Sequence, residues 1–137
     1  MSLSSDSRRL AARLDALPQE IIEALRPALV RSADEVAANM TGLAPRDEGD
    51  LIASIAVTPP GGTTPPYAAG GGSRTAGPNE AFVTVGNTDV RYAHIIEFGR
   101  VGAAAQPFMR PGWRLARARI ERRLKRAISA VVKRVTR

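Results

Sequence analysis

Apolar residues recur at helical spacing along the first forty positions of the chain. One stripe of a 3.6-residue helix holds Leu10, Leu14, Leu17, Ile21, Leu25, Leu29, Val36 and Met40. Pro18, followed by Gln19-Glu20, suits the first turn of a helix. Pro27 lies inside the pattern and predicts a bend about one turn upstream. The spacing therefore predicts a short helix over about 4–16 and a longer, kinked helix over 18–41.

Two segments in the middle of the chain predict a β-hairpin. Residues 44–50 are polar and rich in turn formers, and 51–57 then predicts a helical turn that leads into a strand, with Asp50 available as a cap. Residues 81–85 alternate in polarity and end at Gly86, which is typical of a strand. We expect these two strands to pair antiparallel.

The segment between these strands, residues 59–80, holds six glycines and five prolines. This composition predicts a long mobile loop or arm in which neither regular element forms and no core is buried. Two interpretations stay open: a flexible hairpin tip without a role, or an arm that orders only against a neighbouring subunit.

A final helix is predicted over residues 111–137. Pro111 suits its first turn, because the N–H that proline lacks has no intrahelical partner there. One face of this helix is apolar and carries Trp113, Ala116, Ile120, Leu124, Ala127, Ile128, Val131 and Val135. Most of the arginines and lysines lie on the other face.

Length and composition indicate a single domain over residues 1–137. No window approaches the roughly 20 consecutive apolar residues of a membrane-spanning helix, and the N-terminus lacks the apolar run of a signal peptide. We therefore expect a soluble protein made in the cytoplasm, with no membrane partner. The absence of cysteine excludes disulfides, thiolate metal sites and cysteine nucleophiles.

Positive charge is concentrated at the C-terminus. From Arg110 onward there are eleven basic residues and one acid, a net charge of +10, whereas residues 1–109 carry nine basic and twelve acidic side chains, a net charge of −3. Such a subunit can face DNA with one end or pack head-to-tail on a neighbour. The residues predicted to make these contacts are Arg114, Arg119, Arg122, Arg123, Lys125, Arg126 and Lys133. Without interleaved aromatic residues a DNA contact would be non-specific, and a solvated helix face balanced against acidic neighbours is the alternative.

The equipment for catalysis is sparse. His94 is the only histidine, and the chain has neither a nucleophile elbow nor a phosphate-binding loop followed by Lys-Ser or Lys-Thr. We interpret His94 as a packed or interface side chain. Asp47, Glu48 and Asp50 form an acidic cluster with too few further oxygen ligands for Ca²⁺, so helix capping or intersubunit charge pairing is the preferred role. We expect no enzyme activity, no cofactor and no metal.

Two segments carry recognisable motifs. Residues 44–55 read Ala-Pro-Arg-Asp-Glu-Gly-Asp-Leu-Ile-Ala-Ser-Ile, and residues 92–99 read Tyr-Ala-His-Ile-Ile-Glu-Phe-Gly, followed by Gln-Pro-Phe-Met-Arg-Pro over 106–111. In their order and spacing these motifs resemble the signatures of the tail-component family of siphophages, small proteins encoded between the capsid and the major tail protein. Glu48 stands where that family has threonine, and Met109 where it has leucine.

The resemblance implies an α+β fold in which a long kinked N-terminal helix and the C-terminal helix pack on a small antiparallel sheet with long mobile loops. It implies a structural virion protein of the neck, assembled in the host cytoplasm, that forms a homo-oligomeric ring of six copies. The ring would complete the tail and join it to the DNA-filled head. The implied partners are the protein itself, head-closure or connector proteins and the tail terminator or tail tube protein, and dsDNA in the channel is a further candidate.

The resemblance also implies framework roles for its motif positions. In the family pattern Gly49, Leu51 and Ile55 turn the chain and fill the core. Glu97 and Gly99 fix the turn beside the sheet. Phe108 and Pro111 anchor the last helix. The full set is Pro45, Gly49, Leu51, Ser54, Ile55, Tyr92, Glu97, Gly99, Pro107, Phe108 and Pro111.

Three other functions stay open. A tail terminator, which caps the growing tube, is also a small α+β ring protein that sequence separates poorly from a neck protein. A basic DNA-binding accessory protein would bind duplex DNA with steep salt dependence and would depend on Arg122, Arg123 and Arg126. A small nuclease is the enzyme alternative, and it would require a metal site at Asp47 and Asp50.

Overall fold

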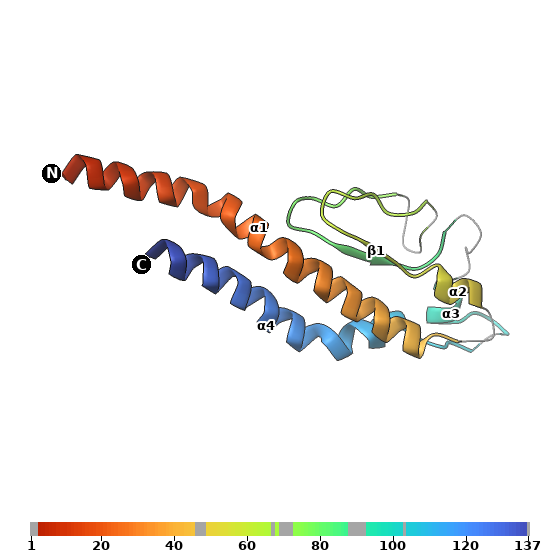
Figure 1. Cartoon of the computed structure of the whole chain (residues 1–137). Helices are drawn as coiled ribbons and strands as arrows, with labels where there is room; N and C mark the ends of the chain where they lie inside the picture. The colour runs from red at the N-terminus through yellow and green to blue at the C-terminus, as the bar shows by residue number, and fades with distance from the viewer. Residues whose placement is uncertain are drawn as a thin grey trace.

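Two long helices form the frame of the molecule, α1 (Leu3–Leu43) and α4 (Met109–Thr136). The shorter elements are α2 (Gly49–Ala53), β1 (Ala56–Thr58), β2 (Phe82–Thr84) and α3 (Ala93–Phe98). The computed structural model describes residues 3–45, 49–66, 68, 73–87, 93–102 and 104–136. Figure 1 shows the long helices side by side, the β-hairpin along α1, and α2 and α3 together at one end.

α1 is one continuous helix that contains both Pro18 and Pro27, so the predicted division into 4–16 and 18–41 is wrong. A proline inside a helix costs roughly 3 kcal/mol through a lost hydrogen bond and a ring clash, but it bends a helix more readily than it ends one. The apolar stripe of the sequence keeps its phase across Pro18, so the same face continues on both sides of it. The ribbon bends in this part of α1 (Figure 1).

α4 packs antiparallel along α1, and the buried side chains of both helices form the core. On α1 the buried apolar residues are Ala33, Val36 and Met40, and on α4 they are Ala116, Ile120, Val131 and Val135. Their spacing of three, four or more residues is that of one helix face, and burial of each large side chain contributes about 1.5–3 kcal/mol. Trp113 and Ile128, which the pattern placed on the apolar face of α4, lie at its edge and remain 45% and 37% exposed.

The short elements extend this core at the end of the molecule where α1 stops and α4 begins. Leu51 of α2, Val85 after β2, Ala93 of α3 and Phe108 before α4 are all buried there. Phe108 and Val85 are fully buried. Four segments far apart in the sequence therefore meet in one cluster with Met40 of α1.

β1 and β2 form a two-stranded antiparallel sheet, which confirms the predicted hairpin. Ala56 lies opposite Thr84 and Thr58 opposite Phe82. Both strands contact α1. The prediction of an α+β fold, with two long helices packed on a small antiparallel sheet, is thus confirmed.

The described part of the 59–80 segment is folded back on itself, contrary to the expectation that it buries nothing. Thr63 and Thr75 form an antiparallel bridge, and Ala76 donates to the Gly62 carbonyl at 2.8 Å. Ala76 is only 2% exposed. Gly61 has a φ of +85°, a backbone conformation that residues other than glycine rarely adopt, and the chain turns there. Small side chains let the neighbouring backbones approach, so glycine-rich composition did not prevent packing.

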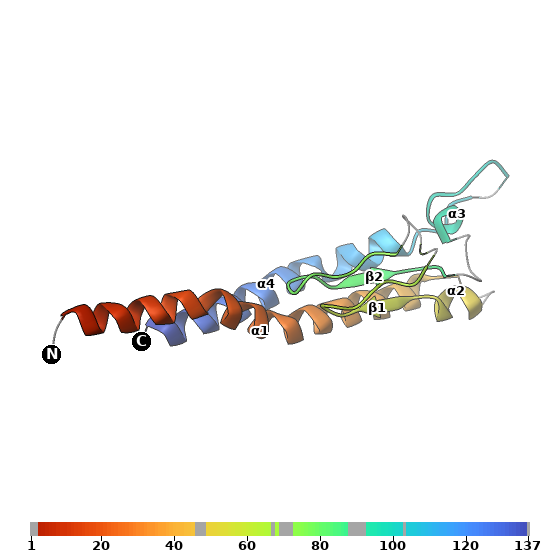
Figure 2. The same cartoon turned by 90° about the horizontal axis from the view of Figure 1, so that it is seen from above.

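α1 extends past the end of α4. Glu20 lines the same hollow as Arg134 and Val135, so the end of α4 lies beside the fifth and sixth turns of α1. The first turns of α1 therefore have no part of α4 opposite them. Figure 2 shows this overhang at the N-terminal end, with the α3 loop projecting at the opposite end.

Candidate functional site

Glu97 joins α3 to the start of α4. Its side chain is buried, and Oε1 accepts hydrogen bonds from the backbone N–H groups of Phe108, Met109 and Arg110 at 3.1, 2.7 and 3.3 Å. The first N–H groups of a helix lack intrahelical partners and lie at the positive end of its dipole, so a carboxylate there stabilises the helix. A residue of one helix thus caps the next across the intervening loop.

The loop between α3 and α4 is held at its base and exposed at its tip. Gly99, with a φ of +75°, donates to the Ile95 carbonyl and ends α3, and Gln106 donates to the Ile96 carbonyl at 2.7 Å. Val101 is fully exposed. This loop projects from the α3 end of the molecule (Figure 2).

Phe98 lies at the base of the same loop and is 61% exposed. The Arg110 guanidinium lies 4.8 Å from the centre of its ring, a cation–π contact. With Val101, Phe98 gives this end of the molecule two large apolar side chains in solvent. We call this pair the apolar tip of the α3 loop and take it as a candidate contact surface for another protein.

The other motif segment is tied to the sheet by Ser54. Its hydroxyl donates to the Leu51 carbonyl at 2.7 Å and accepts from the Gly86 backbone N–H at 3.0 Å. Both contacts are buried, and Gly86 has a φ of +97°, at the position where the chain leaves β2. Ser54 therefore fastens the end of α2 to the end of β2.

The motif positions inferred from the family resemblance differ widely in exposure. Leu51, Ser54, Glu97 and Phe108 are buried, Pro45, Ile55, Gly99 and Pro111 are half-buried, and Gly49 and Pro107 are exposed. Tyr92 lies outside the described residues. The structure brings the two motif segments to the same end of the molecule, where Leu51 and Phe108 share one core cluster.

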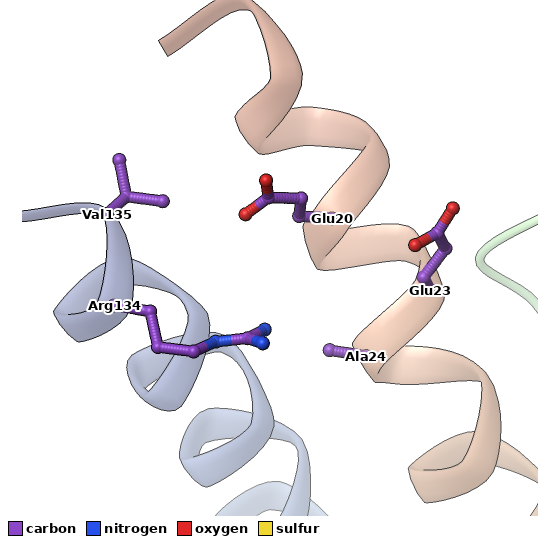
Figure 3. A pocket seen from close by; sticks show the side chains of 5 residues that line it. All are labelled: Glu20, Glu23, Ala24, Arg134 and Val135. Atoms are coloured by element: carbon purple, nitrogen blue, oxygen red, sulfur yellow. The ribbon is translucent and has the colours of Figure 1, made fainter. Parts of the chain in front are cut away.

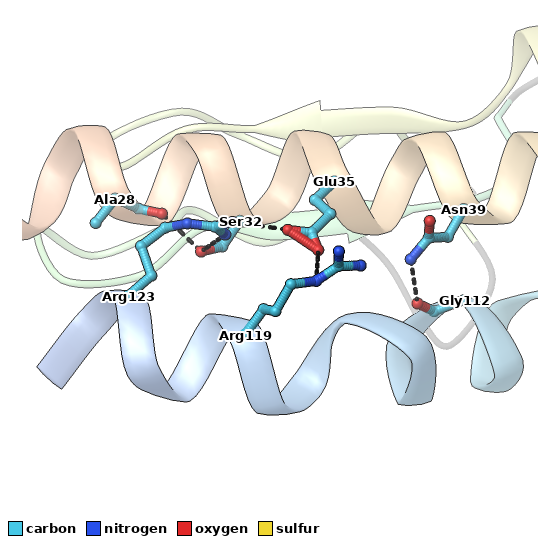
Figure 4. A network of polar contacts seen from close by, with 7 residues as sticks. All are labelled: Ala28, Ser32, Glu35, Asn39, Gly112, Arg119 and Arg123. Carbon is cyan, nitrogen blue, oxygen red and sulfur yellow. Dashed lines mark hydrogen bonds and ion pairs between the residues drawn. The ribbon is translucent and has the colours of Figure 1, made fainter. Parts of the chain in front are cut away.

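The basic residues singled out on the last helix fall into two environments. Arg123 is half-buried, and the others are exposed along α4: Arg114, Arg119, Arg122, Lys125, Arg126 and Lys133. Figure 4 shows Arg119 and Arg123 reaching from α4 toward α1. The basic face is therefore partly used to hold the two long helices together.

Glu35 of α1 forms ion pairs with both of these arginines. Its carboxylate lies 2.7 Å from Nη2 of Arg123 and 3.1 Å from Nε of Arg119, and Nη1 of Arg123 donates to the Ser32 hydroxyl at 2.9 Å (Figure 4). The hydrogen bond from Arg123 lowers the pKa of Glu35, and the charges of Arg119, Arg123 and Arg31 act in the same direction against the opposing effect of burial. We call Glu35, Arg119 and Arg123 the interhelix clasp.

Near the other end of the helix pair, α1 and α4 make close backbone contact. The Asn39 side-chain amide donates to the Gly112 carbonyl at 3.1 Å (Figure 4). A Cβ atom on Gly112 would lie 2.8 Å from Cγ of Met40 and 3.2 Å from its backbone nitrogen. Glycine is thus required here because a larger residue would push the helices apart.

A third interhelix contact region lies near the chain end. Glu20, Glu23 and Ala24 of α1 and Arg134 and Val135 of α4 line an open hollow of about 590 Å³. The Arg134 side chain extends from α4 toward α1 between them (Figure 3). Acidic residues on α1 therefore face the basic end of α4.

The polar residues of α1 that meet α4 were missed by reasoning from the sequence. Ser32, Glu35 and Asn39 recur at steps of three and four, which is a helical stripe like that of the core residues beside it. That spacing was the available signal. Their partners lie 73 to 91 residues away, so a single sequence without the antiparallel pairing of α1 and α4 does not connect them.

The structure describes only part of the acidic cluster and only the backbone of His94. Asp50 is exposed in the first turn of α2, whereas Asp47, Glu48 and the His94 side chain lie outside what the structure describes. Among the described residues, no three His, Asp or Glu side chains gather as a metal site would require. None of the described helices is both long and apolar enough to cross a membrane.

The chain matches a known protein family. The family model described as "Bacteriophage HK97-gp10, putative tail-component" matches residues 8–99, from the first turns of α1 through the end of α3. No curated protein and no solved structure matches the chain. The match covers most of the chain and includes both motif segments up to Gly99, so the protein belongs to the HK97 gp10-like family of bacteriophage tail components.

Proposed function

We propose that this protein is a structural component of the phage neck, where it forms a ring that completes the tail and joins it to the DNA-filled head. Membership of a tail-component family over residues 8–99 is the observation that carries the proposal. Six copies form the ring, which contacts the head-closure or connector proteins on one side and the tail terminator or tail tube on the other.

The distribution of surfaces supports a ring. A subunit in a closed ring needs two different surfaces, because each copy presents one to its left neighbour and the other to its right. The apolar tip lies at one end of this molecule, and the first turns of α1, which extend past α4, lie at the opposite end (Figure 2). The two ends are unlike, as head-to-tail packing requires.

The polar contacts of the motif residues support a structural role and not a catalytic one. The Ser54 hydroxyl and Oε1 of Glu97 bind backbone groups of this same chain. Glu35 binds arginines of α4. These side chains fix the relative positions of elements, which is what a protein that works by shape needs.

Electron microscopy of particles from a producer strain lacking this gene tests the proposal. We expect filled heads beside separate tails of normal length, because both halves form but do not join. Overlong tails would instead identify a tail terminator. Normally joined, intact particles would overturn the neck assignment.

Complementation of the same strain tests the role of the apolar tip. We expect that the Phe98→Ser/Val101→Ser double variant fails to restore joined particles, whereas wild-type protein restores them. Leu115→Ser is the control for loss of an exposed apolar side chain, because Leu115 is 63% exposed and belongs to α4 and not to the loop. Full joining by the double variant would show that the tip is not a contact surface.

A further inference from the structure

An arginine-lined groove lies between the two long helices beside the interhelix clasp. Its volume is about 360 Å³, and the residues that line it are Arg31 of α1 and Arg119, Arg122, Arg123 and Arg126 of α4. All five are guanidinium side chains, which carry their charge at any physiological pH. We call this feature the arginine groove.

The charge of the arginine groove is not balanced within the described part of the chain. Glu35 is the one carboxylate there in an ion pair with groove residues, and it serves Arg119 and Arg123 together. No described carboxylate lies within ion-pairing distance of Arg31, Arg122 or Arg126. Guanidinium groups held side by side repel one another, so an anion from outside would stabilise the groove.

The groove continues along α4. A second hollow, lined by Lys125, Arg126, Ser129, Ala130, Lys133 and Arg134, shares Arg126 with the first. Arg119, Arg122, Arg126 and Lys133 also follow one another at steps of three, four and seven, which is one stripe of a helix. At 1.5 Å per residue this stripe is about 20 Å long, enough to face several successive phosphates of a nucleic acid strand.

A second copy of this chain is a poor match for such a surface. The protein carries a net charge of +7, so two copies repel each other overall and a neighbour does not supply the surplus of negative charge that the groove requires. A nucleic acid backbone instead supplies closely and evenly spaced negative charges along a line. Its phosphate oxygens also match the forked donors of arginine, which bind them in pairs.

We propose that the arginine groove binds phosphate groups of double-stranded DNA, without reading its sequence. Arg31, Arg122 and Arg126 contact the phosphates directly, and Arg119 shares this contact with its ion pair to Glu35. Arg123 is a positioning residue, because Ser32 and Glu35 already hold its guanidinium. This inference deepens the proposed function, on which it rests, by assigning the surface of the ring subunit that faces DNA in the channel.

Fluorescence anisotropy with a labelled random-sequence duplex and the full-length protein tests the inference. Each phosphate contact contributes about 0.9 to the slope of log affinity against log salt. We expect the Arg122→Gln/Arg126→Gln double variant to bind about tenfold more weakly or worse and to reduce the magnitude of that slope by about 2. A second duplex of unrelated sequence should bind equally well.

The matched control is the Arg74→Gln/Arg100→Gln double variant. It removes the same charge from exposed positions outside α4 that do not line the groove, so its slope should stay within about 0.5 of wild type. Equal losses in the two double variants would overturn the assignment, because they would indicate bulk charge alone. Circular dichroism of both variants shows whether the helices are intact.

Two competing anions distinguish DNA from the other ligands that could bind in the groove. Inorganic phosphate that displaces the duplex at low millimolar concentration, at constant ionic strength, would indicate a site for free phosphate and not for DNA. Polyglutamate that binds as tightly as the duplex would indicate an acidic protein partner, and either result overturns the proposal. Joined particles from a strain carrying Arg122→Gln/Arg126→Gln, together with lost DNA binding, would leave the neck assignment intact and limit the groove to DNA contact.

Discussion

Oε1 of Glu97 accepts a 2.7 Å hydrogen bond from the backbone N–H of Met109, the first residue of α4. Because the same oxygen serves two further N–H groups, Glu97→Ala leaves the start of α4 uncapped and should destabilise the protein by about 1–3 kcal/mol. Glu97→Gln keeps an acceptor but loses the charge, so its loss should be smaller. Urea unfolding measures both. Glu121→Gln, which alters an exposed ion pair with Arg117, should change stability by less than about 0.5 kcal/mol, and equal effects at the two positions would refute the capping role.

Substitution of glycine by alanine should have opposite effects on stability at two glycines within the long helices. At Gly112 a new Cβ would meet Met40 at 2.8 Å, so Gly112→Ala should destabilise the fold by about 1–3 kcal/mol by forcing α1 and α4 apart. At Gly42 nothing lies within 4 Å of the new atom, so Gly42→Ala should stabilise α1 by about 0.5–1 kcal/mol. Thermal unfolding of both variants checks the signs. A stabilising Gly112→Ala would mean that the helices are not in close contact there.

The clasp at Glu35 predicts a pH dependence of stability. The pKa of Glu35 is lowered in the folded state, so its carboxylate stabilises the fold above the unfolded value of about 4.3, and this contribution is lost as the pH falls through the folded-state pKa. Glu35→Gln should therefore be less stable than wild type by about 1–2 kcal/mol at pH 7, with the difference shrinking toward zero in acid. Urea midpoints from pH 7 to pH 3 measure it. A difference that is constant across this range would exclude ionisation of Glu35 as its cause.

Ser54 offers a test of the first motif segment. Ser54→Ala removes the only described partner of the Gly86 N–H at a buried position, so we expect a loss of about 1–3 kcal/mol. Ser129→Ala, an exposed position on α4, is the control and should be nearly neutral. Hydrogen exchange at the Gly86 amide, followed by NMR, should accelerate in the Ser54 variant alone.

The larger features of this fold follow from residue pattern because they are local. Three local patterns each predicted an element: the apolar stripe of α1, the alternation over 81–85 and the apolar face of α4. Each pattern depends only on residues that are near one another in the sequence. Pro18 misled because a proline was expected to begin a helix, whereas here it lies within one. The 59–80 segment misled because composition reports what glycine and proline disfavour and not which backbone hydrogen bonds they can still make.

The candidate sites were harder to predict because they depend on pairing between distant segments. The basic character of α4 is evident in the sequence. The pattern alone does not show that Arg123 forms an ion pair with Glu35 whereas Arg122 is exposed. The contribution of Arg31 to the groove requires the antiparallel alignment of α1 and α4. Likewise, the motif around Glu97 predicted a turn, and the structure adds that its carboxylate caps the next helix.

The overhang of α1 beyond α4 gives the molecule a gradient of local unfolding free energy. As an isolated peptide, a helix as short as the overhanging part of α1 would be only marginally stable in water. Here that part continues a helix that is already nucleated and packed against α4. Amide protons near Arg8 should therefore exchange fastest in α1, with protection rising through the Glu20 region toward Val36. In the proposed ring, an end that opens without disturbing the core would let a subunit adjust one contact during assembly while the rest of it stays folded.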